Sequence, residues 1–272
     1  MTTLDLTTHD NPNGRNAEWR SFTFPDGQPH ISIRSPEHVT RIRTRITSSE
    51  ELMLLLLARA LVPSPSLYIS YLLGGRMDRR MPMSPEGFEH PATLSVVAHL
   101  LNMFSWHSIA LFDPHSEVST ALLSATPVLP VTLVKAAIQF SQPDVLIAPD
   151  LGASKRVEEL GRLVHLPVVQ AVKNRDPSTG QLSGFRLLDS GMVRDKKCLI
   201  VDDIIDGGGT FAGLALVLLE EEKAARVSLA VSHGIFSKGS NVAGVDHIYT
   251  TDSYQSFNAS TLPEHVTVVP WG

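Results

Sequence analysis

The residues best suited to chemistry stand in one stretch of the sequence, Cys198–Thr210, which reads CLIVDDIIDGGGT. Its apolar run Leu199–Val201 predicts a buried strand of a parallel sheet. Asp202 and Asp203 follow at the predicted carboxyl end of that strand, the edge where open parallel sheets bind ligands. Two carboxylates there are costly to bury without a partner, and a carboxylate accepts two hydrogen bonds well from the vicinal hydroxyls of a sugar.

The three glycines after these acids predict a phosphate site. Gly207, Gly208 and Gly209 carry no side chains, so the backbone can approach an anion closely. A helix beginning at Thr210 would add backbone N–H groups, positive potential and a hydroxyl. A diol-binding pair followed by a phosphate cradle suits a ribose 5-phosphate. The alternative is a glycine-rich turn beside a surface acidic pair, whereas a nucleotide P-loop does not fit because no Gly-Lys-Ser/Thr follows.

Short apolar runs alternate with longer helical patterns, which predicts an α/β fold with parallel sheets covered on both faces. Strands are predicted at residues 31–33, 67–72, 108–112, 145–148, 168–172, 199–201, 227–231 and 247–250, and helices at residues 50–61, 92–103, 154–164 and 210–222. Two such halves would join near residues 127–143. We expect a loose arm over residues 1–18, an N-terminal domain over residues 19–134 and a C-terminal domain over residues 135–272. The polar stretch 174–184 predicts a mobile loop between two strands.

Composition narrows the class of protein. The 272 residues include 43% hydrophobic and 19% charged residues, a globular balance, and the net charge of -5 does not suggest a nucleic-acid surface. The single cysteine, Cys198, excludes an intrachain disulfide and a cysteine metal cage and favours a reducing, cytoplasmic setting. The polar N-terminus does not read as a signal peptide, and the longest apolar run, Leu52–Ala58, is too short to span a membrane. We therefore expect neither nucleic-acid nor membrane partners.

The stretch Cys198–Thr210 resembles the phosphoribosyl-diphosphate (PRPP) binding motif shared by type I phosphoribosyltransferases and PRPP synthetases, also called ribose-phosphate pyrophosphokinases. Further segments resemble the synthetases in order over about residues 20–255: Phe24-Pro-Asp-Gly27, Arg76-Met-Asp-Arg79, Asp113-Pro-His115-Ser, Ala148-Pro-Asp150 through Arg156, Lys173-Asn-Arg175, Ser232-His-Gly-Ile-Phe236 and Thr251-Asp252. The resemblance implies two tandem type I phosphoribosyltransferase-like domains, each a mostly parallel sheet flanked by helices. It also implies transfer of the pyrophosphoryl group of Mg-ATP to the anomeric hydroxyl of ribose 5-phosphate, with release of AMP.

The resemblance also implies a role for individual residues. Lys173 and Arg175 would stabilise charge on the transferred phosphates, and Asp206 would take the proton of the attacking hydroxyl. The ribose and its 5-phosphate would be held by Asp202, Asp203, Asp206, Gly207, Gly208, Gly209 and Thr210. ATP would be held by Phe24, Asp26, Gln28, Arg76, Asp78 and His115, with Phe24 and Arg76 stacking on the adenine. His115 and Asp150 would serve Mg²⁺, and the chain would form a homo-oligomer, from a dimer up to a hexamer.

Four departures from the family pattern affect the expected substrate. Gly207 stands where the synthetases have threonine, Met77 where they have glutamine and Gln28 where they have glutamate, and the chain is shorter. Gly207 removes a hydroxyl and is expected to open space, so an acceptor with a 5-phosphodiester, such as ADP-ribose in NAD metabolism, is one alternative to ribose 5-phosphate. A non-catalytic, synthetase-like regulatory partner and a phosphoribosyltransferase that consumes PRPP are the others.

Overall fold

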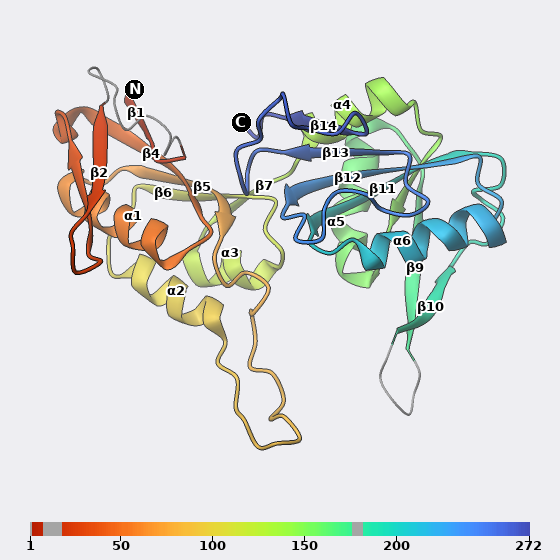
Figure 1. The fold of residues 1–272 in the computed structure, drawn as a ribbon, viewed down its shortest axis with the longest axis horizontal. Helices are drawn as coiled ribbons and strands as arrows, with labels where there is room; N and C mark the ends of the chain where they lie inside the picture. Colours follow the sequence, from red (N-terminus) through yellow and green to blue (C-terminus); the bar gives the residue numbers. More distant parts are fainter. Residues whose placement is uncertain (1, 8–17, 176–181) are drawn as a thin grey trace. The chain divides into compact units, whose positions relative to one another are not determined.

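The computed structural model describes residues 2–7, 18–175 and 182–272, with the side chains of residues 174, 175, 182 and 183 left aside. The chain divides into two compact units, Met1–Val128 and Leu129–Gly272, each of which is an α/β unit (Figure 1). Residue 134, where the sequence analysis divides the chain, lies inside helix α4, Val131–Ser141. None of the described helices is long and apolar enough to cross a membrane.

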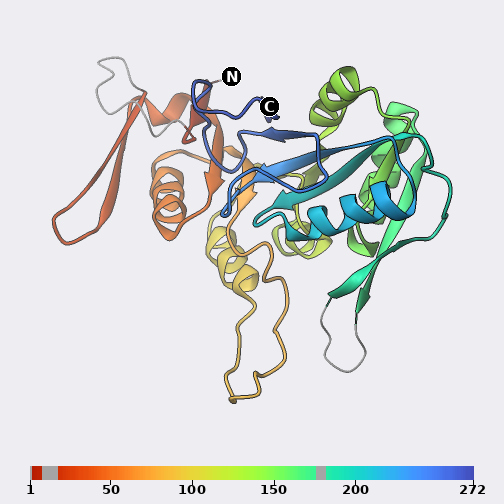
Figure 2. The same ribbon diagram turned by 45° about the vertical axis from the view of Figure 1, so that its right-hand side comes forward.

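The first unit contains a five-stranded parallel sheet in the order β1-β4-β5-β6-β7. Its strands are β1 Thr2–Asp5, β4 Val39–Ile46, β5 Ser66–Leu72, β6 Ser108–Phe112 and β7 Thr126–Val128. Its helices are α1 Ser49–Leu61, α2 Thr93–Asn102 and α3 Glu117–Leu123, with a short 3-10 turn at Pro36–His38. An antiparallel hairpin of β2 Trp19–Thr23 and β3 Pro29–Ile33 completes the unit and projects from it in Figure 2.

The loose arm predicted over residues 1–18 is wrong at its beginning. Residues Thr2–Asp5 form β1, which pairs in parallel with β4, and Leu4 is fully buried. The side chain of Arg45 donates a 2.7 Å hydrogen bond to the carbonyl oxygen of Thr7 and so fixes the end of this segment. Only one of these four residues is apolar, so the local pattern is too weak to predict a strand. Pairing with β4 stabilises the strand instead.

The sheet of the first unit buries one face in a hydrophobic core. Alternate residues of the strands, such as Ile42, Leu67 and Leu111, pack with apolar residues of α1, α2 and α3 in a single cluster. The opposite face carries polar residues at the amino ends of the strands: Arg41 and Ser108 there are exposed, and Tyr68 is partly exposed. The predicted α/β fold with a mostly parallel sheet is confirmed for this unit.

The second unit contains a seven-stranded sheet in the order β10-β9-β8-β11-β12-β13-β14, parallel throughout except for the antiparallel pair β9 and β10. Its strands are β8 Val145–Ala148, β9 Val168–Arg175, β10 Leu182–Leu187, β11 Lys197–Ile205, β12 Arg226–Gly234, β13 His247–Thr251 and β14 Val266–Val269. Its helices are α4, α5 Leu151–Val164 and α6 Gly209–Leu216, which continues as a π-helical turn over Val217–Glu221.

Both faces of this second sheet are buried. Within strand β11, Ile200 packs into a cluster with residues of α6, whereas its neighbours Leu199 and Val201 pack into another with residues of α4 and α5. Successive residues of a strand point to opposite faces, so a strand buried on both sides must be apolar throughout. That requirement explains the continuous apolar runs from which β8, β11 and β12 were predicted.

Candidate active site

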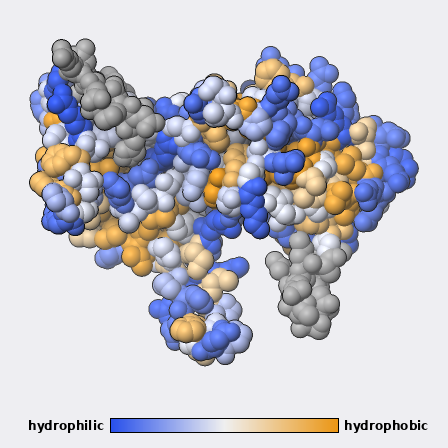
Figure 3. Space-filling view, in the orientation of Figure 1, coloured by the Kyte–Doolittle hydropathy of each residue, from blue (hydrophilic) through white to orange (hydrophobic). Residues whose placement is uncertain are grey.

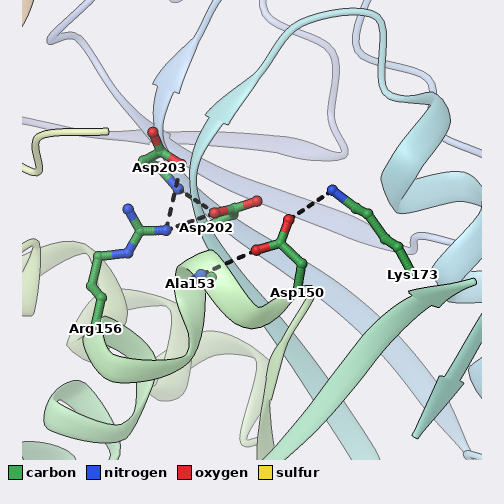
Figure 4. A network of polar contacts seen from close by, with 6 residues as sticks. All are labelled: Asp150, Ala153, Arg156, Lys173, Asp202 and Asp203. Carbon is green, nitrogen blue, oxygen red and sulfur yellow. Dashed lines mark hydrogen bonds and ion pairs between the residues drawn. The ribbon is translucent and has the colours of Figure 1, made fainter. Parts of the chain in front are cut away.

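The carboxyl ends of three neighbouring strands of the second unit bring the predicted site residues together. Asp150 follows β8, Lys173 lies near the end of β9, and Asp202 and Asp203 lie in the last part of β11. Figure 4 shows these side chains converging on one region with Arg156 of helix α5. Their order in space follows from the parallel register, because parallel strands end at the same edge of a sheet.

Asp150 joins the start of α5 to the catalytic lysine predicted from the sequence. Its Oδ1 accepts the backbone N–H of Ala153 at 3.1 Å as the N-cap of α5, and its Oδ2 accepts a hydrogen bond from Lys173 Nζ at 2.7 Å. Burial alone would raise the pKa of Asp150, but Lys173 and the N–H groups of the α5 N-terminus outweigh it, so the pKa is held below its usual value. Asp150 is therefore a fixed anion that holds the Lys173 ammonium at the edge of the sheet.

Arg156 is the cation that accompanies the two adjacent aspartates. Its Nη2 lies 2.6 Å from Asp202 Oδ1 and 3.4 Å from Asp203 Oδ1, and Asp202 Oδ1 also accepts the backbone N–H of Asp203 at 2.9 Å. Burial, followed by repulsion from Asp203, raises the pKa of Asp202 to about 8, although Arg156 opposes the rise. One oxygen of the Asp202 carboxylate is thus committed to internal contacts that orient the pair.

Sequence reasoning placed Arg156 in a family segment and gave it no role. Its side chain is only 14% exposed, and it contacts carboxylates 46 and 47 residues away in the chain. A helix position six residues beyond Asp150 gives no local sign of that contact. Only the fold shows that this arginine is buried beside two acidic residues, and this burial is the sign of its role.

The glycine loop after β11 has the geometry expected of an anion site. Gly208 is the N-cap of α6 with a φ of 74°, a left-handed conformation that favours glycine, and its N-cap position carries no side-chain hydrogen bond. Thr210 lies in the first turn of α6, where helix N–H groups face outward. Asp206, at the start of this loop, accepts a short hydrogen bond from the hydroxyl of Ser237. The loop can therefore present backbone donors to a phosphate.

The space expected beside Gly207 is occupied. A Cβ atom placed on Gly207 would lie 3.2 Å from Cδ and 3.5 Å from Cε of Lys238, closer to Cδ than is usual for a packed side chain. The stem of Lys238 thus takes up the volume that a threonine would fill. The prediction that Gly207 opens room for a larger acceptor is wrong on this point. The contact joins two residues that are distant in the chain, so no local pattern indicates it.

The predicted adenine contacts in the first unit lie on two different segments. Phe24 follows β2 at the hairpin turn, is 43% exposed, and makes an edge-on contact with Phe22 at 4.9 Å between ring centroids. In that turn Asp26 Oδ1 accepts the backbone N–H of Gln28 at 3.2 Å. Phe24 is therefore an exposed aromatic and not a core residue.

Arg76 and Asp78 lie at the start of the long excursion between β5 and α2, and Arg76 is exposed. This excursion protrudes in Figure 3 as a lobe where polar and apolar side chains mix, and its exposed apolar residues are Met81, Met83 and Phe88. His115 is exposed in the loop between β6 and α3. The ATP-binding roles of these residues stay predictions.

The described residues include no group of three or more histidine, cysteine, aspartate or glutamate side chains that could hold a metal ion. Asp150 nevertheless suits Mg²⁺, which is often bound by one or two carboxylates together with water and substrate phosphates. The predicted catalytic residue Arg175 ends β9, but its side chain lies outside the described part of the structure, as do residues 176–181 of the predicted loop.

Comparisons with known proteins agree with this geometry. The phosphoribosyl transferase domain family matches residues 134–266, which lie within the second unit. The ribose-phosphate pyrophosphokinase of Mycoplasma pneumoniae is 29% identical over 89% of this chain and 77% of its own length. That of Hyphomonas neptunium is 27% identical over 91% of this chain and 83% of its own. Over most of its length the chain is therefore similar to ribose-phosphate pyrophosphokinases.

A solved structure shows that the fold is shared as well. The phosphoribosylpyrophosphate synthetase of Mycobacterium smegmatis matches with a TM-score of 0.73 and 20% identity, covering 93% of this chain and 85% of that one. The α/β fold with mostly parallel sheets is therefore shared with that synthetase. Because this match spans both compact units, the resemblance seen over residues 20–255 is not confined to the glycine loop.

Proposed function

We propose that this protein transfers the pyrophosphoryl group of Mg-ATP to the anomeric 1-hydroxyl of ribose 5-phosphate, giving PRPP and AMP. The observation that carries the proposal is the order of groups along the edge of the second sheet. The Asp202–Asp203 pair ends β11, the glycine loop and the α6 N-terminus follow it, and the Asp150–Lys173 ion pair stands at the ends of the neighbouring strands. This edge of the sheet therefore offers the aspartates to the acceptor sugar, the α6 N-terminus to its phosphate, and Lys173 to the transferred phosphates.

The acceptor is held by β11 and the loop after it. Carboxyl oxygens of Asp202 and Asp203 accept hydrogen bonds from the 2- and 3-hydroxyls, and Arg156 keeps this pair oriented at 2.6 Å and 3.4 Å. The 5-phosphate lies at the glycine loop, where the α6 N-terminus supplies backbone N–H donors and positive potential. A sugar fixed at both ends presents its 1-hydroxyl in one orientation, which lowers the entropic part of the barrier.

In the transfer step the 1-oxygen of the sugar forms a bond to the β-phosphorus of ATP. The bond between that phosphorus and the oxygen bridging it to the α-phosphorus breaks, and AMP leaves with that oxygen. The proton of the 1-hydroxyl passes to Asp206, whose carboxylate Ser237 orients. Lys173, held at 2.7 Å from Asp150, is placed to donate to phosphate oxygens whose charge grows in the transition state.

Mg²⁺ would be held by Asp150 together with substrate phosphate oxygens and water, and it would neutralise charge on the phosphates. Asp150 can serve both the ion and Lys173 because it is a fixed carboxylate with its pKa lowered. His115, which the family resemblance assigns to the same ion, belongs to the first unit and keeps that role as part of this proposal.

Mass spectrometry of the products tests the proposal directly. The full chain is incubated with Mg-ATP and, in separate reactions, ribose 5-phosphate, ADP-ribose and nicotinamide mononucleotide. We expect AMP and PRPP in the first reaction, because pyrophosphoryl transfer releases AMP and phosphoryl transfer would release ADP. ADP as the nucleotide product, or AMP release that does not depend on the sugar, contradicts the proposal.

A matched pair of variants then locates the activity. Asp203→Asn removes a charge at the edge of β11, where the Asp203 side chain is 7% exposed. We expect kcat/KM for ribose 5-phosphate to fall by about 10²-fold or more, since hydrogen bonds to a charged acceptor are lost. Asp246→Asn removes a carboxylate that pairs with Arg226 on the surface at 3.1 Å, with about half of each side chain exposed, and should leave the rate unchanged.

A further inference from the structure

The segment Ile235–Val242 packs along the glycine loop of the proposed phosphate site. The backbone N–H groups of Ile235 and Phe236 donate to the carbonyl oxygen of Ile205 at 2.9 Å and 3.4 Å. Ser237 donates to Asp206, and Val242 Cγ2 lies 3.0 Å from where a Cβ of Gly208 would stand. Contacts at both ends of the segment therefore fix the position of the residues between them.

Lys238 is the one lysine of this segment, and its stem crosses directly over Gly207. Its Cδ, Cε and Cγ lie 3.2, 3.5 and 3.7 Å from the position of a Gly207 Cβ. The ammonium nitrogen is one further C–N bond of about 1.5 Å beyond Cε, so it lies within about 5 Å of that position. Because residue 238 is exposed, its ammonium can reach a ligand at the mouth of the loop.

Gly207 and Lys238 thus form a pair in which one residue makes room for the other. Gly207 has no positive φ, so its backbone would accept a side chain such as threonine, and only Lys238 opposes one. The neutral hydroxyl that the family resemblance places at this position is absent, and a cationic side chain stands over the same atoms. The exchange adds positive charge to the loop without changing its backbone.

We propose that Lys238 is a specificity-determining residue that binds the terminal 5-phosphate of the acceptor and selects a phosphate monoester over a phosphodiester. The proposal rests on the proposed function, because it places the acceptor's phosphate at the same glycine loop. A terminal monoester carries up to two negative charges and three free oxygens, whereas a diester carries one charge and two, so a cation at the loop favours the monoester. The stem of Lys238 over Gly207 also occupies space that a larger substituent beyond the phosphate would need.

Steady-state kinetics and isothermal titration of Lys238→Ala test the inference. We expect both KM and the dissociation constant for ribose 5-phosphate to rise by about 10- to 100-fold, the range for loss of one charge-assisted hydrogen bond. The KM for ATP should stay within about 2-fold of wild type. Lys238→Arg should retain most of the affinity, and Lys135→Ala, which removes an exposed lysine from α4, should change neither constant.

A double substitution tests the pairing of the two residues. Gly207→Thr alone places a Cβ 3.2 Å from the Lys238 stem and should weaken ribose 5-phosphate binding by displacing it. Gly207→Thr combined with Lys238→Ala should bind ribose 5-phosphate more tightly than either single variant, because the hydroxyl then replaces the ammonium. Additive losses in the double variant would contradict the pairing, and thermal unfolding of all four proteins separates loss of binding from loss of folding.

The outcomes distinguish this inference from the function on which it rests. If the wild-type chain makes PRPP and AMP but Lys238→Ala leaves its affinity for ribose 5-phosphate unchanged, the inference fails and the function stands. If the wild-type chain neither binds ribose 5-phosphate nor releases AMP with it, both fail. For the selectivity, the variant should lose more affinity for ribose 5-phosphate than for ADP-ribose, and equal losses would overturn the selection of a monoester.

Discussion

Strand β11 of the second unit and strand β4 of the first both carry charged residues in a parallel sheet, but the charges stand in different surroundings. In β4 the residues Arg41, Arg43 and Arg45 alternate with Ile42, Thr44 and Ile46, so the cations share the face opposite the hydrophobic core. In β11 the apolar run continues on both faces until Asp202. Alternating charges thus mark the face of a sheet that lies away from the core, whereas adjacent acidic residues at the end of a doubly buried strand mark a candidate binding site.

The largest expected effect on stability comes from the arginine that serves the β11 aspartates. Arg156→Met leaves Asp202 and Asp203 buried without their cation and should lower the free energy of unfolding by about 3–5 kcal/mol. Arg41→Met, on the exposed face of β4, should change it by less than about 0.5 kcal/mol. Urea denaturation measures both, and equal losses in the two variants would break the distinction between the strands.

A comparable free-energy difference is expected in catalysis from the lysine of β9. Lys173→Ala should lower kcat by about 10²- to 10³-fold, because a preorganised cation is lost from the transition state. Arg41→Gln removes a cation from a strand of the first sheet and should leave kcat within about 2-fold of wild type. Rates of AMP release with ribose 5-phosphate measure both effects. A wild-type rate in Lys173→Ala would show that the ion pair with Asp150 is structural only.

Core truncations sharpen the contrast in face burial. Leu199→Ala and Ile200→Ala are neighbours on opposite faces of β11, and each should cost about 2–4 kcal/mol because both faces are packed. In β5 of the first unit, Leu67→Ala should cost a similar amount, whereas Ser66→Ala on the other face should cost less than about 0.5 kcal/mol. Denaturation of the four variants tests this, and a tolerated change at either Leu199 or Ile200 would speak against a doubly buried strand.

The smallest effect concerns pH. The pKa of Asp202 is about 8 in the folded protein against 3.8 ordinarily, so between these values the folded state holds a proton that the unfolded state has lost. Its contribution to stability is full below pH 4 and is lost as pH rises through about 8. Without substrate, wild type should lose about 1 kcal/mol more than Asp202→Asn between pH 7 and pH 8, a difference of about 2–4 °C in Tm.

Thermal unfolding of both proteins at the two pH values measures this difference. Asp246→Asn, on the surface beside Arg226, serves as the control and should follow wild type. Parallel pH profiles of wild type and Asp202→Asn would show that Asp202 does not hold the proton.

The second unit could be predicted from its sequence more fully than the first. Continuous apolar runs identified β8, β11 and β12, because burial on both faces leaves a simple pattern. Strand β4 was not predicted, since its alternating arginines obscure a half-buried strand. The alternation was present in the sequence and would have predicted this strand.

The residues of the candidate site likewise divide into those that the sequence predicted and those that only the structure reveals. The aspartate pair, the glycine loop and Lys173 were predicted because their chemistry is local and follows strands that were themselves predicted. The contacts of Arg156 with Asp202 and of Lys238 with Gly207 join segments far apart in the chain, so only the folded structure reveals them. The expected room beside Gly207 failed for the same reason, because a missing side chain says nothing about which neighbour fills its place.

A crystal of the full chain soaked with ribose 5-phosphate gives the most direct test of the central claim. The account predicts electron density for the sugar at the carboxyl end of β11, with hydroxyls within hydrogen-bond distance of Asp202 or Asp203 and the phosphate against Gly207–Thr210. Density for the sugar phosphate in another part of the molecule, with the Asp202–Thr210 stretch unoccupied, would contradict it.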